Sequence, residues 1–242
     1  MRIQACLNGA RPPAFHPALP LDPAAMAREA VACVLAGADA LHLHPRDATG
    51  RESLSADSVD AVLSAVRTAL PETPTGISTG EWIENDQKRT LAAIAGWRLL
   101  PDYASVNFSE AGAPAVFEAL ARRGVGIEAG LADESDAERF LSLGLAPRTL
   151  RILVEIDLQG LEKAIATAKA VLTLTSRLGC PRLLHGFDAT FWPLARKAAA
   201  LGLSLRVGLE DCSRLPCGSI AQDNAELVAA ARSLMLTPAA QC

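Results

Sequence analysis

The chain contains four histidines, and two of them, His42 and His44, lie two positions apart in the sequence LHLHPRD (residues 41–47). The leucines before and between them predict a strand, in which residues two apart point to the same side, roughly 7 Å from each other along the chain. Two imidazoles aimed into one space can be neighbouring ligands of a single cation. Because an isolated pair of this kind is more often a packing feature, the metal hypothesis needs a further ligand elsewhere in the chain.

A carboxylate for such a site is available in the segment RVGLED (206–211), where Arg206 and Glu210 share one face of a predicted strand and Asp211 begins the next loop. A catalytic zinc site can consist of two histidine ligands, one carboxylate ligand and open coordination positions. Iron(II) binds the same set of ligands. Two interpretations of Arg206 stay open. It forms a buried ion pair with Glu210 that fixes the strand register, or it pairs with Asp211 and tunes that carboxyl group as a base.

Further polar residues follow other predicted strands and are candidates for substrate contacts. Ser78, Thr79 and Gly80 lie in the turn GISTGEW, whose hydroxyls and backbone N–H groups can hold a carboxylate, although an ordinary glycine-rich turn has the same composition. Glu128 shares a strand face with glycines, which leaves space for a ligand. Asn8 and Asn107 are either satisfied internally at the mouth of the fold or contact a substrate, and Ser105 shares a strand face with Asn107. Glu155 either indicates a polar or charged distal group on the substrate or is part of the buried structure.

The elements that must position these residues alternate between short strand-like runs and amphipathic helical runs. The predicted strands are 2–8, 40–44, 74–79, 103–108, 125–131, 150–158, 182–187 and 204–211. Each is followed by a helical stretch, such as 22–38 and 161–179, with capping signals at Asp22, Ser55, Gly124 and Gly179. Eight such units predict a (β/α)8 TIM barrel, one domain over residues 1–242, with its active site at the C-terminal ends of the strands. A doubly wound sheet is the alternative.

The strands also indicate which side chains face the barrel interior. In LRILVEIDL (150–158), apolar residues at 152, 154, 156 and 158 alternate with a mixed set that includes Glu155. Helices surround a barrel, so the apolar face is expected to point outward and Glu155 inward.

Composition excludes several classes of function. The net charge is −4, the pI is about 5.6 and aromatic residues make up 4% of the chain, which disfavours nucleic acid or an anionic membrane surface as a partner. No apolar run is long enough to span a membrane, and no secretory leader is recognisable. Six scattered cysteines predict reduced thiols in the cytoplasm. Cys212 and Cys217 are most simply incidental thiols, with a zinc pair or a disulfide as alternatives.

Several motifs, taken in order, resemble the β-keto acid cleavage enzymes, the family that includes the 3-keto-5-aminohexanoate cleavage enzyme. They are LNGAR, LHLHPRD, ISTG, ASVNFS, GIEAG, RVGLED and DNAELV. The resemblance runs through most of the chain, and the pairing of H-x-H-x-R-D with a late R-x-G-x-E-D is its most specific part. It implies a zinc-dependent barrel that combines a β-keto acid with acetyl-CoA to give acetoacetate and the CoA thioester of the remaining fragment.

The resemblance also implies roles for individual residues. His42, His44 and Glu210 would bind one Zn²⁺ per chain, and Arg206 and Asp211 would assist deprotonation. Ser78 with neighbouring backbone N–H groups, and Ser105 or Asn107, would hold the substrate, and Glu128 matches an acid at the variable substrate end. A homo-oligomer, dimer or tetramer, is expected. Arg46 and Asp47 are predicted to orient the two histidines.

The loops are shorter than is usual in this family, and Arg11 stands where an acid is often found. These differences affect the substrate end and the CoA approach, so the sequence does not name the keto acid. An amidohydrolase barrel is disfavoured because its H-x-H motif lies on the first strand. Two alternatives stay open: an enolate-stabilising barrel enzyme of aldolase or isomerase type that does not use CoA, and a catalytically silent barrel that binds a keto acid or a metal.

Overall fold

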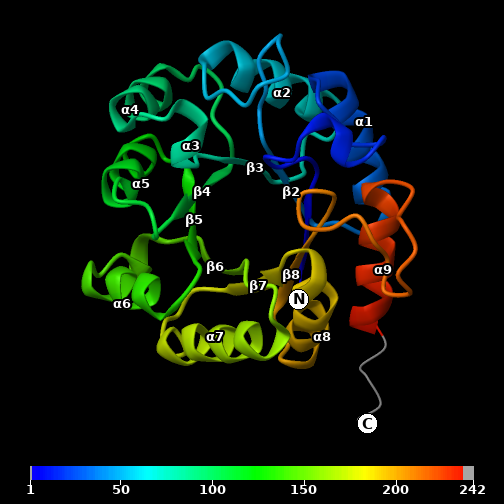
Figure 1. The fold of residues 1–242 in the computed structure, drawn as a ribbon. Coiled ribbons are helices and arrows are strands. Elements are labelled where there is room, and N and C mark those ends of the chain that lie inside the picture. Colours follow the sequence, from blue (N-terminus) through cyan, green and yellow to red (C-terminus); the bar gives the residue numbers. More distant parts are fainter. Residues whose placement is uncertain (1, 237–242) are drawn as a thin grey trace.

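Eight parallel strands form the centre of the structure, a computed structural model that describes residues 2–236 (Figure 1). Each strand pairs with the next in sequence and β8 pairs with β1, so the sheet closes into a barrel. The strands are β1 (Ile3–Cys6), β2 (Ala40–Leu43), β3 (Thr75–Ser78), β4 (Tyr103–Asn107), β5 (Gly126–Leu131), β6 (Arg151–Ile156), β7 (Arg182–Gly186) and β8 (Ser204–Val207). The predicted (β/α)8 barrel is confirmed, and the open doubly wound sheet is excluded.

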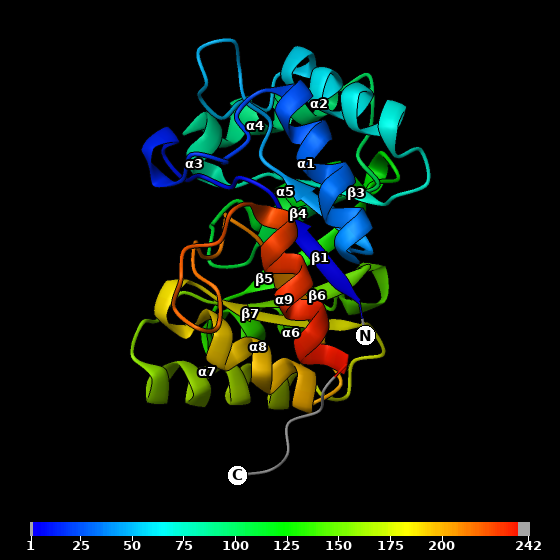
Figure 2. The same ribbon diagram turned by 90° about the vertical axis from the view of Figure 1, so that its right-hand side faces the viewer.

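Helices surround the ring of strands, and the loops that follow the strands gather at one end of the barrel (Figures 1 and 2). The α-helices are α1 (Pro23–Ala36), α2 (Ala56–Ala69), α3 (Glu81–Glu84), α4 (Gln87–Gly96), α5 (Ala113–Arg122), α6 (Glu134–Ser142), α7 (Leu161–Leu174), α8 (Phe191–Ala200) and α9 (Asn224–Leu236). Short 3₁₀ turns are η1 (Pro13–Phe15), η2 (Ala146–Arg148) and η3 (Asp188–Thr190).

Local sequence explains where the helices begin and end. The side chains of Asp22 and Ser55 each accept a hydrogen bond from a backbone N–H three residues on, and so cap α1 and α2 as predicted. The helix expected at 161–179 is shorter than predicted and ends at Leu174. The Thr175 hydroxyl donates to the carbonyl four residues earlier, a local bond that competes with continuation of the helix.

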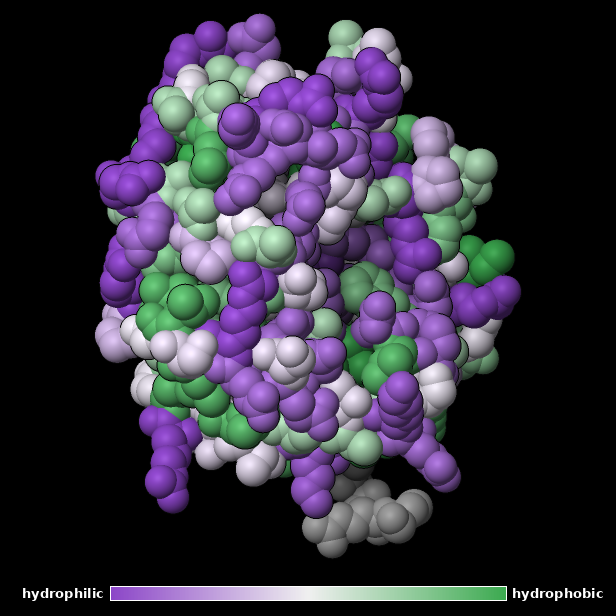
Figure 3. Space-filling model, turned by 60° about the vertical axis from the view of Figure 1, so that its left-hand side comes forward, coloured by the Kyte–Doolittle hydropathy of each residue, from purple (hydrophilic) through white to green (hydrophobic). Residues whose placement is uncertain are grey.

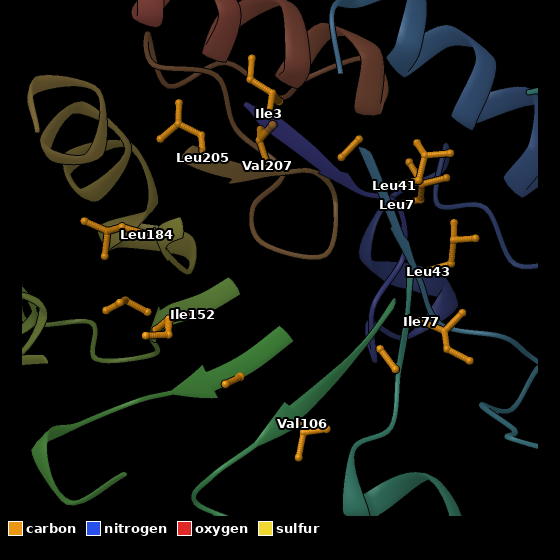
Figure 4. Packing of buried hydrophobic residues seen from close by; sticks show 14 of the residues in the cluster. Ile3, Leu7, Leu41, Leu43, Ile77, Val106, Ile152, Leu184, Leu205 and Val207 are labelled. Carbon is orange, nitrogen blue, oxygen red and sulfur yellow. The ribbon is translucent and has the colours of Figure 1, made fainter. Parts of the chain in front are cut away.

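The main core lies between the barrel and the helices. Ile152, Val154 and Ile156 of β6 are fully buried in it, as the alternating pattern predicts. Figure 4 shows apolar side chains of several strands on the outer side of the ring, towards the helices. Each fully buried side chain of this kind stabilises the fold by about 1.5–3 kcal/mol. Because these apolar side chains point outward to the helices, the inner face of the strands is available for polar groups.

The N-terminal halves of the strands fill the barrel interior with a polar and aromatic cluster. The Gln4 amide donates to the Tyr103 hydroxyl over 2.8 Å and to Glu128 over 3.2 Å. Glu128 is fully buried and forms an ion pair with Arg151, whose guanidinium lies 4.4 Å from the centre of the Tyr103 ring. Glu128 therefore has protein partners inside the barrel. Its predicted contact with the substrate stays a prediction.

Strand β8 is shorter than the predicted range 204–211 and ends at Val207. A Cβ atom on Gly208 would lie 2.0 Å from the carbonyl oxygen of Cys6, so this close approach requires glycine. The chain then turns, with the Asp211 N–H donating to the Gly208 carbonyl over 2.9 Å. Glu210 and Asp211 consequently lie on a turn beyond the strand instead of within it.

Hydrophilic side chains predominate on the face in Figure 3, with smaller apolar patches between them. Within residues 2–236, no helix is long and apolar enough to cross a membrane. The cysteines in that range, including Cys212 and Cys217, are free thiols. Cys242 lies outside the described residues. The cytoplasmic location and the homo-oligomer stay predictions.

Replacement of Glu128 by Gln should destabilise the fold, because it leaves the Arg151 guanidinium largely buried without its countercharge. The expected loss in free energy of unfolding is about 3–5 kcal/mol, measured by urea denaturation followed by circular dichroism. The matched control is Glu118→Gln, which removes a carboxylate from an exposed pair with Arg148 and should leave stability unchanged. Equal stability of the two variants would contradict the structural role of Glu128.

Candidate metal centre and active-site cavity

His42, His44 and Glu210 meet at the C-terminal end of the barrel. His42 belongs to β2, His44 follows it directly, and Glu210 lies on the turn after β8. The two Nε2 atoms are 3.2 Å apart, and the carboxylate oxygens of Glu210 lie 3.3 Å from His44 Nε2 and 3.9 Å from His42 Nε2. Ligand atoms of a tetrahedral zinc with bonds of 2.0–2.1 Å are roughly 3.3 Å apart. The three side chains therefore fit around one small cation.

Burial and charge also fit a cation at this point. All three side chains are buried, and Glu210 Oε2 has no hydrogen-bonding partner among the described residues. Burial lowers the pKa of His44, but the charges of Glu210 and Glu52 outweigh it and raise that pKa to about 9. The surroundings of His44 thus stabilise positive charge, which a divalent metal can supply in place of the proton, whereas burial lowers the pKa of His42 well below its usual value and favours the neutral imidazole that binds a metal.

Glu52 is part of this centre and was not predicted from the sequence. Its carboxylate lies 2.5 Å from His44 Nδ1 and accepts a hydrogen bond of 3.1 Å from the Trp82 indole N–H. The Trp82 ring stacks on His44 with the ring centres 6.4 Å apart. A carboxylate bound to the second nitrogen of a ligating histidine fixes the orientation of its ring. Glu52 lies in an irregular loop, where no periodic pattern marks it.

The prediction that Arg46 and Asp47 orient the histidines is wrong. The Arg46 guanidinium donates to the backbone carbonyls of Gly9 and Arg11, and Asp47 closes a turn with Thr49. Within the described residues, neither side chain forms a hydrogen bond or ion pair with a histidine. Arg46 instead joins the loops after β1 and β2.

Two buried asparagines hold the backbone of the centre in place. The Asn8 amide exchanges two hydrogen bonds of 3.0 Å with the backbone of His44. Asn224 accepts from the Leu209 N–H over 2.8 Å and donates to the Leu7 carbonyl over 3.1 Å, which ties the turn after β8 to β1. Asn8 thus supports the metal centre through the backbone. The predicted contact between Asn8 and a substrate stays a prediction.

Arg206 lies between three carboxylates. Its Nε donates to Asp211 over 3.1 Å, one terminal nitrogen contacts Glu210, and the other lies 3.5 Å from Glu155. Arg206 therefore pairs with both Glu210 and Asp211, and its role in tuning Asp211 as a base stays a prediction. Burial raises the pKa of Asp211 to about 6, although the charge of Arg206 acts in the opposite direction.

A cavity of about 540 Å³ opens at this end of the barrel. Its lining includes the three side chains of the metal centre together with Arg206, Ser78, Ser105, Asn107, Trp82, Glu155, Asp157, Gln159, Phe187, Asp188 and Arg11. The Glu155 side chain reaches the cavity, in agreement with its predicted inward position. Gln159, Phe187 and Asp188 were not predicted because they lie in loops without a strand pattern.

Several predicted site residues lie behind the lining of this cavity. The Thr79 hydroxyl donates to the Ser105 carbonyl over 2.6 Å, and the Gly80 N–H donates to the Ser78 hydroxyl over 3.2 Å. Thr79 and Gly80 thus fix the turn that presents Ser78. Asp211 is fully buried and, with Glu128, is not among the described residues that line the cavity.

A family model described as "beta-keto acid cleavage enzyme" matches residues 1–239. The chain belongs to the β-keto acid cleavage enzyme family. This membership confirms the resemblance predicted from the motifs.

Solved structures support the fold of this family member. A ternary complex of ObcA with a C4-CoA adduct and oxalate has a TM-score of 0.76 and 19% identity, covering 91% of this chain and 64% of ObcA. A binary complex of ObcA with oxaloacetate gives 0.74 and 18%, with the same coverage. A 3-dehydroquinate dehydratase from Geobacillus kaustophilus gives 0.63 and 11%, covering 97% of this chain and 90% of the other. The chain spans less than two thirds of ObcA, and these likenesses show the fold alone.

The contact between Glu52 and His44 predicts a weaker metal site when Glu52 is replaced by Gln. The affinity for zinc should fall by about 10–100-fold, because the amide holds the His44 ring less firmly than a carboxylate does. Competition with a coloured chelator measures this affinity. Asp47→Asn removes a nearby carboxylate that does not contact the histidines and should bind zinc as the unmodified protein does. Equal affinities for all three proteins would contradict the role of Glu52.

Proposed function

We propose that this β-keto acid cleavage enzyme is zinc-dependent and combines a β-keto acid with acetyl-CoA. The products are acetoacetate and the CoA thioester of the remaining acyl fragment. The observation that carries this proposal is the buried cluster of His42, His44 and Glu210 at the wall of the cavity, in a chain of this family. The three side chains would hold one Zn²⁺ and leave a side open to the cavity.

The substrate would bind between the metal centre and the hydroxyl groups of the cavity. When bound, zinc supplies a Lewis acid for the carboxylate and keto oxygens of the substrate. Ser78, Ser105 and Asn107 line the same space and can donate hydrogen bonds to these oxygens. Thr79 and Gly80 hold Ser78 in position, and Asn8 holds His44. We also assign Glu128 to the variable end of the substrate, from its buried position beside Arg151.

The reaction begins with loss of a proton from the carbon between the carboxylate and the keto group. The resulting enolate attacks acetyl-CoA and releases the CoA thiolate, which then attacks the original keto carbon. Cleavage of the carbon–carbon bond gives the new thioester and the enolate of acetoacetate, which regains the proton. We assign assistance of this proton transfer to Arg206 and Asp211. Because Asp211 is fully buried, it acts through another group or a water molecule.

The substrate end of the cavity is polar. Arg11 donates to the Glu210 carbonyl over 2.9 Å and forms an ion pair of 2.9 Å with Asp188. Asp157 and Gln159 also line the cavity. These groups support a β-keto acid with a polar or charged distal substituent.

Protein purified without added metal should contain about one zinc per chain, measured by elemental analysis. His42→Ala should lose both the zinc and the activity with its circular dichroism spectrum retained, because two remaining ligands hold zinc weakly. The matched control is His16→Gln, at a buried histidine that contacts the Ala221 carbonyl away from the metal centre. Active protein without metal would contradict the proposal.

A panel of β-keto acids with acetyl-CoA, followed by free thiol and by acetoacetate, tests the reaction itself. At least one acid should give acetoacetate and a new CoA thioester in equal amounts. Consumption of a keto acid without acetyl-CoA would indicate an aldolase-type or isomerase-type enzyme instead. Bound zinc without turnover of any acid would indicate a binding protein.

A further inference from the structure

Trp82 is a large aromatic side chain that lies partly exposed at the wall of the cavity. It is 44% exposed, and its ring stacks on His44 with 23° between the ring planes. A tryptophan left partly in water forgoes some of the free energy that its burial would supply. Core packing therefore does not explain its position. Trp82 belongs neither to the three candidate metal ligands nor to the predicted substrate contacts.

The Trp82 indole and the His44 imidazole bind the two oxygens of one carboxylate. Glu52 Oε1 lies 2.5 Å from His44 Nδ1, and Glu52 Oε2 accepts from Trp82 Nε1 over 3.1 Å. The other ring nitrogen of His44, Nε2, faces His42 and Glu210. Because each oxygen of Glu52 has a contact of its own, the plane of the carboxylate is fixed. Trp82 thus holds His44 in two ways, through Glu52 and by stacking on the imidazole ring.

The single helical turn α3 brings Trp82 to the metal centre. It ends at Asn85, whose φ of 51° lies in the left-handed region that asparagine tolerates. The Glu84 carboxylate accepts from the Leu54 N–H over 2.9 Å, so α3 is also tied to the loop that carries Glu52. The turn with the tryptophan and the loop with the carboxylate are therefore held together at two points.

Glycine at position 80 allows the indole to lie close to the backbone. A Cβ atom there would be 2.2 Å from the far edge of the Trp82 ring. The φ of Gly80 is −52°, which every residue can adopt, so it is the close approach of the ring that favours glycine. The turn that presents Ser78 to the cavity and the ring that stacks on His44 are therefore packed against each other.

We propose that Trp82 is a positioning residue of the metal centre, which fixes the Glu52 carboxylate and the His44 ring so that Nε2 faces the cation. This inference rests on the proposed function, because it requires a metal at that centre. A ligand group that is already held in place loses little conformational freedom when it binds, which strengthens binding. Loss of either contact of Trp82 should therefore weaken the metal site without removing any ligand.

The test is the zinc affinity of the full-length protein, measured by titration of the zinc-loaded form with a coloured chelator. Trp82→Phe keeps an aromatic ring on His44 but loses the N–H donor, and should bind zinc about tenfold more weakly, the lower end of the loss for an outer partner of a ligand. Trp82→Leu removes both contacts and should lose more. The matched control is Trp192→Phe, which removes an indole donor to the Arg214 carbonyl and should bind zinc as the unmodified protein does.

The connection through Glu52 is tested by combining two substitutions. In Glu52→Gln protein, Trp82→Phe should change the zinc affinity by no more than about twofold, because the carboxylate that the indole orients is already absent. Gly80→Ala keeps the tryptophan but displaces its ring, and should weaken zinc binding as Trp82→Phe does.

Two further measurements distinguish positioning from a merely structural role. Removal of zinc should change the tryptophan fluorescence of the unmodified protein, because the indole stacks on an imidazole that binds the metal. This change should be lost in Trp82→Phe and kept in Trp192→Phe. Zinc-free Trp82→Phe should unfold at the same temperature as the zinc-free unmodified protein. A lower unfolding temperature with an unchanged zinc affinity would assign Trp82 a structural role instead.

The outcomes separate this inference from the proposed function. A zinc affinity of Trp82→Phe within about twofold of that of the unmodified protein would overturn the inference and leave the zinc site standing. A tenfold loss that recurs undiminished in the Glu52→Gln protein would overturn the connection through Glu52. An unmodified protein that holds no zinc would overturn the proposed function, and this inference with it.

Discussion

One buried guanidinium among three carboxylates holds the catalytic end of the barrel together. Arg206 contacts Glu210, Asp211 and Glu155, which come from two different parts of the chain. Such a concentration of negative charge is unfavourable without countercharges, because burial removes the water that would screen it. Arg206 offsets part of it, and His185 and the metal centre face the rest. The position of each carboxylate therefore depends on the same guanidinium.

A second polar layer lies inside the barrel, on the side of the metal centre towards the N-terminal ends of the strands. In the N-terminal halves of the strands, Gln4 contacts Tyr103 and Glu128, and Glu128 pairs with Arg151. Above them the side chains are only partly satisfied, and Glu210 Oε2 has no partner among the described residues. Buried polar groups without partners are costly to the fold. A buried carboxylate oxygen without a partner beside two imidazoles is what a site that binds a cation requires.

Most of the correct predictions follow from the alternation of apolar and polar residues along the strands. Alternation along β6 correctly separates the outward Ile152 and Val154 from the inward Glu155, because strand geometry is local. The end of β8 could not be predicted in this way, since it depends on the approach of Gly208 to β1. Glu52 was missed for a similar reason, because only the folded loop brings it to His44. The sequence indicates no partner for His185, because only the folded chain brings it beside Glu155.

The central claim is that His42, His44 and Glu210 hold one zinc ion at the cavity. A crystal structure of the protein as purified, with diffraction measured on both sides of the zinc absorption edge, tests this most directly. One anomalous peak per chain is expected, at roughly 2.0–2.2 Å from the Nε2 atoms of both histidines and from a carboxylate oxygen of Glu210. The absence of a peak there in active protein, or a zinc bound at Cys212 and Cys217 instead, would contradict it.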